Sequence, residues 1–149
     1  MKFFKSLILI FFLSSCGYST IYNDKNNDIK IKVVNSKGNS NMNSKIIKQI
    51  KNFSDKDSNN IINVNIDSNY QNQIISRSST GSIDDYKIIL NVVYTFEVDN
   101  NVEILNIKQD FKLKNTDESF ERQKNESTLV NNFITSSVRK LFLNITAIK

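Results

Sequence analysis

The chain has 149 residues and a formal net charge of +5, with one cysteine, three glycines and no histidine, proline or tryptophan. The lack of histidine excludes the Ser-His-Asp triad and the usual zinc-ligand sets, and three glycines are too few for a glycine-rich phosphate loop. A single cysteine excludes an internal disulfide. We therefore expect a protein that is not an enzyme, binds no metal and needs no cofactor.

The first sixteen residues have the layout of a bacterial lipoprotein signal. Lys2 and Lys5 form a charged start, residues 7–13 form an apolar run, and Leu13-Ser14-Ser15-Cys16 closes it. The run is far shorter than the roughly 20 apolar residues that span a bilayer, so we expect no permanent transmembrane helix. The ending is similar to a lipobox, which predicts cleavage before Cys16 and lipid attachment to its thiol. An ordinary signal with an incidental cysteine is the alternative.

The predicted organisation has three parts: a signal peptide at residues 1–15, which cleavage removes, a lipidated tether at residues 16–27 and a single domain at residues 28–149. The 134 residues that remain are about the size of one domain, and their formal charge falls to +3 because Lys2 and Lys5 are lost. That surplus is too small for a nucleic-acid partner, which we do not expect. Mild basicity does suit anionic lipid head groups.

The domain is expected to begin with a strand and a helix. Residues 29–33 alternate apolar side chains with lysines, the period-two pattern of a half-buried strand. Residues 35–39 are expected to form a turn around Gly38. A helix is predicted next, with Ser40 or Asn41 as its N-cap. Its apolar residues recur at helical spacing: Met42, Ile46, Ile47, Ile50 and Phe53.

Three further strands are expected after a polar loop at residues 54–60, because apolar and polar residues again alternate. They run from Ile62 to about Ser76, over residues 86–98 and over residues 105–113, separated by turns at residues 78–82 and 99–101. The middle one carries apolar side chains on both sides, so both of its faces are expected to be partly covered. Asn and Asp in the last turn tolerate the positive φ that tight hairpins demand.

From about Asp117 the apolar period changes from two to 3.6, which predicts a long helix. Acidic residues near its start and basic residues near its end complement the helix dipole. Its apolar stripe is Val130, Phe133, Ile134, Val138, Leu141, Phe142 and Ile145. The expected fold is α+β, a two-layer sandwich with two amphipathic helices on one face of a four-stranded sheet, in the order β-α-β-β-β-α.

Two pairs of acidic residues are the candidates for carboxylate chemistry of the kind that glycosidases use. Asp84-Asp85 and Asp117-Glu118 both lie beside turns or helix starts, where acidic residues are common for local reasons. An envelope hydrolase built on either pair is therefore the least favoured alternative.

Three short stretches and the order of elements resemble the LptE family of outer-membrane lipopolysaccharide-assembly lipoproteins. Cys16-Gly17-Tyr18 is similar to the family's Cys-Gly-aromatic start. Residues 78–81 (Ser-Ser-Thr-Gly), followed by residues 86–90 (Tyr-Lys-Ile-Ile-Leu), resemble its small-residue turn and tyrosine-led strand. Residues 138–141 (Val-Arg-Lys-Leu) resemble the end of its last helix. The resemblance covers nearly the whole chain in order and length.

The resemblance implies a partner rather than a reaction. Family members sit as a plug in the lumen of a large outer-membrane β-barrel, LptD, help it to fold and help to deliver lipopolysaccharide to the cell surface. Basic residues are thought to contact the phosphates and acidic sugars of lipopolysaccharide through charge-assisted hydrogen bonds. The candidates for this contact are Arg77, Arg122 and Lys124.

The location that the resemblance implies is the outer membrane, with the domain anchored by lipid and facing the periplasm. Gly17 supports it, because an aspartate at that place resembles an inner-membrane retention signal. The main alternative is a stand-alone lipoprotein on the periplasmic side that acts as an adaptor in another envelope complex and never enters a barrel.

Overall fold

The computed structural model describes residues 29–55, 57–116 and 118–148. The elements follow the predicted order β-α-β-β-β-α: β1 (Lys30–Gly38), α2 (Ser40–Phe53), β2 (Ile61–Arg77), β3 (Ile83–Val98), β4 (Asn101–Lys114) and α3 (Ser119–Ile148). The expected signal peptide, Cys16 and the tether at residues 16–27 lie outside the described residues.

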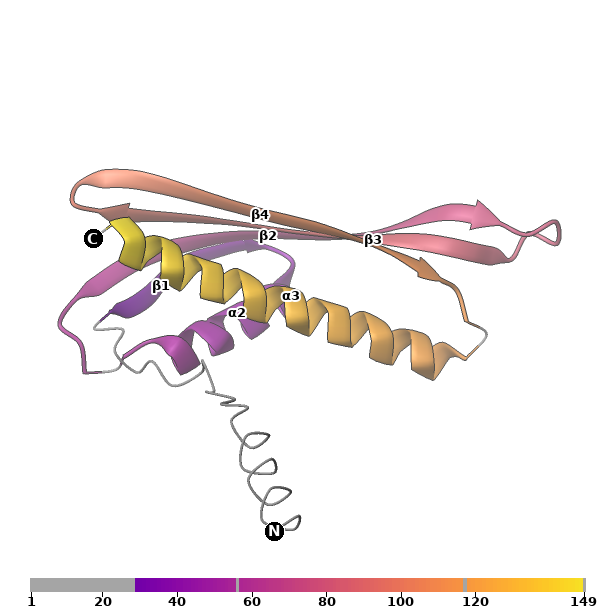
Figure 1. The fold of residues 1–149 in the computed structure, drawn as a ribbon, viewed down its shortest axis with the longest axis horizontal. Coiled ribbons are helices and arrows are strands. Elements are labelled where there is room, and N and C mark those ends of the chain that lie inside the picture. The colour runs from indigo at the N-terminus through magenta and orange to yellow at the C-terminus, as the bar shows by residue number, and fades with distance from the viewer. Residues whose placement is uncertain (1–28, 56, 117, 149) are drawn as a thin grey trace, which may run out of the picture.

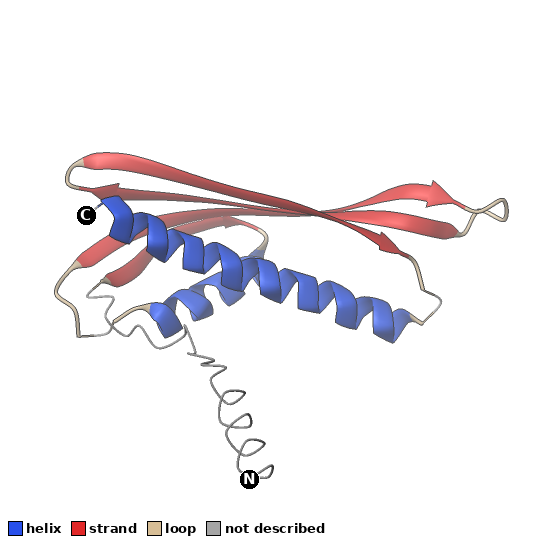
Figure 2. Ribbon diagram, in the orientation of Figure 1, coloured by secondary structure: helices blue, strands red, loops and turns tan. Residues whose placement is uncertain are grey.

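The four strands form one sheet in the order β1-β2-β3-β4. The β1 and β2 strands pair in parallel, which requires the crossover that α2 provides, and the other two pairings are antiparallel. Both helices lie on the same face of the sheet (Figure 1), and no described element covers the other face (Figure 2). The predicted two-layer α+β sandwich is therefore confirmed.

The centre of the core is β3. Its even-numbered side chains from Tyr86 to Val98 are all buried on the helix side, as the alternation of a strand requires. The predicted stripe of α3 packs over them and is buried except for Val130, which is half-buried. One polar pair lies inside this core, where Tyr94 Oη and Ser137 Oγ form a hydrogen bond of 3.0 Å.

The start of α2 differs from the prediction. Asn39, rather than Ser40 or Asn41, is the N-cap, and its side chain accepts a hydrogen bond of 3.0 Å from the Met42 N–H. The cap moves because β1 does not stop at the expected turn. Residues 35–38 continue to pair with β2 after a bulge at Val34, so the chain turns only at Gly38, whose φ is +89°.

The remaining boundaries lie close to the prediction. The last helix begins at Ser119, two residues after Asp117, which itself lies outside the described residues. The hairpin between β3 and β4 turns at Asp99 and Asn100, with φ values of +49° and +65°. This confirms the expected use of Asp and Asn at positive φ.

Two glycines with nearly the same φ provide a matched test of this packing. A Cβ on Gly38 (φ +89°) would overlap the Ser68 carbonyl oxygen, whereas a Cβ on Gly81 (φ +87°) would meet nothing within 4 Å. Gly81→Ala should lower the free energy of unfolding by about 1–2 kcal/mol, the cost of a left-handed conformation. Gly38→Ala adds a backbone displacement and should cost at least about 3 kcal/mol. Guanidinium denaturation of both variants measures the difference; equal losses would contradict the close packing of Gly38 on β2.

Candidate functional site

A polar pocket lies where the first turns of α3 face the far halves of β2 and β3. Its volume is about 330 Å³, and its walls are Asn72, Ile74, Ile83, Tyr86, Asn115, Arg122 and Glu126. These parts of β2 and β3 extend beyond β1 and α2, so α3 is the helix that covers them (Figure 1). Arg122 and Glu126 reach the pocket together because residues four apart share one face of a helix.

We call this feature the Arg122 pocket. Its polar side chains form hydrogen bonds with one another and with Tyr70. The Arg122 guanidinium donates to Asn115 Oδ1 at 2.9 Å, and the Tyr70 hydroxyl at the pocket's side donates to Glu126 Oε2 at 3.4 Å. Burial, and then the Glu126 carboxylate, raise the pKa of Tyr86 to about 12. The same two causes raise the pKa of Tyr70. Both phenols are therefore protonated donors at neutral pH.

The pocket suits a polar ligand of low net charge. Arg122 uses one of its five donors on Asn115, which leaves others for an incoming oxygen atom. Glu126 lies in the same pocket, however, and its carboxylate repels an anion. Hydroxyl groups, which donate and accept, fit this mixture of guanidinium, carboxylate, amide and phenol better than a bare phosphate does.

The other two basic candidates do not line this pocket. Arg77 lies at the end of β2, where its guanidinium donates to the Gly81 carbonyl oxygen at 2.9 Å within the β2–β3 hairpin. Lys124 is exposed on α3. The structure thus places Arg122 in a pocket and leaves Arg77 and Lys124 on the surface. The sequence did not connect Tyr70 with Glu126, because nothing in it pairs residues 56 positions apart.

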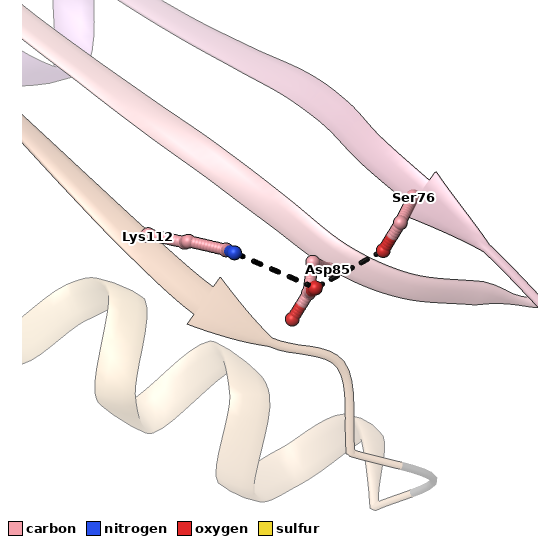
Figure 3. A network of polar contacts seen from close by, with 3 residues as sticks. All are labelled: Ser76, Asp85 and Lys112. Carbon is pink, nitrogen blue, oxygen red and sulfur yellow. Dashed lines mark hydrogen bonds and ion pairs between the residues drawn. The ribbon is translucent and has the colours of Figure 1, made fainter.

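Asp84 and Asp85 do not face one site as a pair, because neighbouring side chains of a strand point to opposite faces of the sheet. Asp85 lies between two neighbouring strands: it accepts a hydrogen bond of 3.0 Å from Ser76 Oγ on β2 and forms an ion pair of 3.7 Å with Lys112 Nζ on β4 (Figure 3). Cross-strand contacts of this kind stabilise a sheet. Asp84 is exposed, Glu118 is exposed, and Asp117 lies outside the described residues.

The uncovered face of the sheet is the second candidate site, and we call it the open face. Its β2 side chains are exposed and rich in amides: Asn63, Asn65, Asp67, Asn69, Gln71 and Gln73. On β3, the side chains that pair with them are half-buried, although no described element covers this face of the sheet. On β4, Val102 and Ile104 are each 68% exposed. Amides beside exposed aliphatic groups make this face suited to binding another protein.

Comparisons with known proteins show what the fold resembles. No protein-family model and no curated protein matches the sequence. The fold is similar to rare lipoprotein B from Shewanella oneidensis (TM-score 0.57, 8% identity, 80% of this chain and 94% of that one). It is also similar to a lipoprotein B from Nitrosomonas europaea (TM-score 0.53, 13% identity, 81% of this chain and 86% of that one). A Caulobacter crescentus protein described as a lipoprotein has a similar fold too (TM-score 0.51, 10% identity, 81% of this chain and 89% of that one). At sequence identities of 8–13%, the similarity of these structures establishes the fold alone.

Among residues 29–55, 57–116 and 118–148, no helix is both long and apolar enough to cross a membrane. The same residues contain no group of three or more Cys, Asp or Glu side chains placed to hold a metal ion.

The electrostatics of the Arg122 pocket can be tested through Tyr86. Glu126→Gln removes a carboxylate that raises the pKa of Tyr86, so this pKa should fall below about 12 but stay above the ordinary value of 10.0, because burial remains. Arg122→Gln removes a cation that lowers it, so the pKa should rise. Titration of the tyrosine ring carbons by NMR measures both shifts. Tyr94, also raised to about 12 but by burial in the core, should not move and serves as the internal control.

Proposed function

We propose that this chain is a non-enzymatic outer-membrane lipoprotein that binds a large β-barrel of the LptD kind. Through this binding it assists the assembly of the lipopolysaccharide export machinery and the delivery of lipopolysaccharide to the cell surface. The open face of the sheet is the single observation that carries the proposal, because it is long, rich in amides along β2 and free of any covering element among the described residues.

The chemistry of the open face supports a barrel as the partner. The lumen of an outer-membrane barrel is lined by polar side chains. Asn and Gln both donate and accept hydrogen bonds, so the row along β2, in which Asp67 is the one charged side chain from position 63 to 73, can match such a wall. Charges on β3 and β4 are partly paired already, as in the contact of 2.7 Å between Lys87 Nζ and Asp110 Oδ2.

The sequence and the fold support the same class of protein independently. The Leu-Ser-Ser-Cys ending at Cys16 predicts a lipid anchor, and the element order implied by the resemblance to LptE is the order observed. The solved structures with a similar fold are bacterial lipoproteins. An anchor at Cys16 would hold the domain beside membrane-embedded partners and raise its effective concentration there.

The Arg122 pocket is the part of the molecule that we assign to lipopolysaccharide. Its mixture of donors and acceptors suits the sugar hydroxyls of the ligand, to which the Arg122 guanidinium can donate. Arg77 and Lys124 remain exposed cations that would add attraction without a shaped site.

The open face can be tested by one pair of variants. Asn65→Arg with Asn69→Arg places two large cations on exposed β2 positions of this face. Recovery of a co-purified large β-barrel from the host's outer membrane, in mild detergent, should fall at least about tenfold. Thermal unfolding should change little, because both positions are exposed.

The matched control makes the same chemical change elsewhere. Gln123→Arg with Asn132→Arg replaces two exposed amides on α3 and should leave barrel recovery intact. Equal loss in both variants would mean that the open face is not the binding surface. Recovery of the wild-type lipoprotein without any barrel, or with periplasmic proteins alone, would overturn the proposal in favour of the adaptor.

A further inference from the structure

A second pocket lies at the other end of the molecule, between α2 and the free edge of β1. Its volume is about 420 Å³, and its walls are mainly aliphatic side chains of β1, α2 and the first residue of β2. Lys30, Lys32 and Lys51 stand among these side chains. We call this feature the lysine-rimmed groove. In Figure 1 it belongs to the end where β1 and α2 lie, away from the β2–β3 hairpin.

Two of its aliphatic side chains face outward instead of into the core. Val34 is 60% exposed and Ile61 is 54% exposed. Val34 occupies the bulge of β1, where the register with β2 shifts, and a bulge re-aims a side chain away from the regular face of a sheet. Exposed aliphatic groups between lysines form an amphipathic surface rather than a scattered set of surface residues.

The charged side chains that line the groove, among the described residues, are all lysines. Residues 29–54 contain six lysines and no aspartate or glutamate. Asp55 and Asp57 follow in the loop after α2, where the Asp55 carboxylate accepts a hydrogen bond from the Asp57 N–H at 2.9 Å. Neither of them lines the groove. An anionic surface would therefore meet Lys32 and Lys51 there, with no carboxylate among the described residues that line the groove.

We propose that the lysine-rimmed groove docks on the anionic phospholipid head groups of the leaflet that holds the lipid on Cys16. Lys32 and Lys51 contact phosphate groups, and Val34 and Ile61 enter the head-group layer beside them. The inference rests on the lipid anchor of the proposed function. It goes beyond that function, because it gives the free lipoprotein a defined orientation before any barrel is bound.

The length of the connecting chain agrees with this arrangement. Thirteen residue steps separate Cys16 from Ile29, which at full extension is about 45 Å. Ile29 directly precedes β1, and β1 supplies one wall of the groove. The part of the domain that joins the anchor is thus the part whose surface matches a membrane, and the Arg122 pocket lies at the remote end.

The test uses the full-length acylated protein in vesicles and a single fluorescent label. Because Cys16 is the only cysteine and its thiol carries the lipid, Val34→Cys can be labelled specifically with an environment-sensitive dye. In vesicles with about 30 mol% phosphatidylglycerol, lipid-borne quenchers should quench this label at least about threefold more than in phosphatidylcholine alone. About 0.5 M salt should remove the difference. A label at Val102→Cys, which is 68% exposed on β4, should show no such difference.

Charge variants complete the experiment. Lys32→Gln with Lys51→Gln should abolish the extra quenching at position 34, whereas Lys108→Gln with Lys114→Gln, the same change on exposed positions of β4, should not. Equal quenching at positions 34 and 102, or no response to phosphatidylglycerol, would overturn the docking surface. Failure of the protein to float with vesicles would show instead that the anchor is absent. Barrel recovery, measured separately, decides the proposed function.

Discussion

The fold depends on the one-sided packing of β3. Seven alternate side chains of this strand, from Tyr86 to Val98, are buried against the helices, while its backbone is hydrogen-bonded to β2 on one side and β4 on the other. Full burial of one large apolar side chain stabilises a fold by about 1.5–3 kcal/mol, so this row and the stripe of α3 supply most of the driving force. With both helices on this face, the other face must remain compatible with water. The amides of β2 meet that requirement.

The unequal lengths of the strands explain why the two ends of the molecule differ. The β2 and β3 strands have 17 and 16 residues, whereas β1 has 9 and α2 has 14. The near end of the sheet is therefore covered by two helices and contains most of the apolar core. The far end is covered by α3 alone, and the space beneath it is lined by polar side chains such as Arg122 and Glu126. Because a single helix does not fill the space over a wide sheet, a pocket remains in which the polar groups of a ligand can bind.

The sequence predicted the elements with strong periodicity and missed the features that depend on contacts between them. The alternation of residues 86–98 and the stripe from Val130 to Ile145 gave β3 and α3 directly, because one side of each must be buried. The N-cap at Asn39 could not be derived locally. It depends on β1 pairing with β2 as far as Gly38, and Asn39 then donates its N–H to the Ser68 carbonyl oxygen at 2.9 Å.

The candidate sites also depend on contacts between elements, which the sequence does not specify. Arg122 was a candidate from its position near the start of a helix, and the structure places it in a pocket. Its companions Tyr70 and Glu126 come from elements that only the tertiary fold brings together. The lysines at 30, 32 and 51 were visible as the polar sides of a strand and a helix. Their convergence on one groove depends on α2 crossing beside β1, which periodicity does not specify.

The two proposed contacts differ in the forces they use. This difference implies that docking on the membrane comes before binding to the barrel. The lysine-rimmed groove relies on charge and on two exposed aliphatic groups, so its attraction to a membrane is screened by salt and carries little specificity. The open face relies on amide hydrogen bonds along β2, whose strength depends on a matching partner surface rather than on ionic strength. The groove borders the near end of the open face, where Lys32 pairs with Asn63, so a domain docked there keeps Asn69, Gln71 and Gln73 of β2 accessible. A barrel that matches the amides can then capture it without first displacing a specific contact.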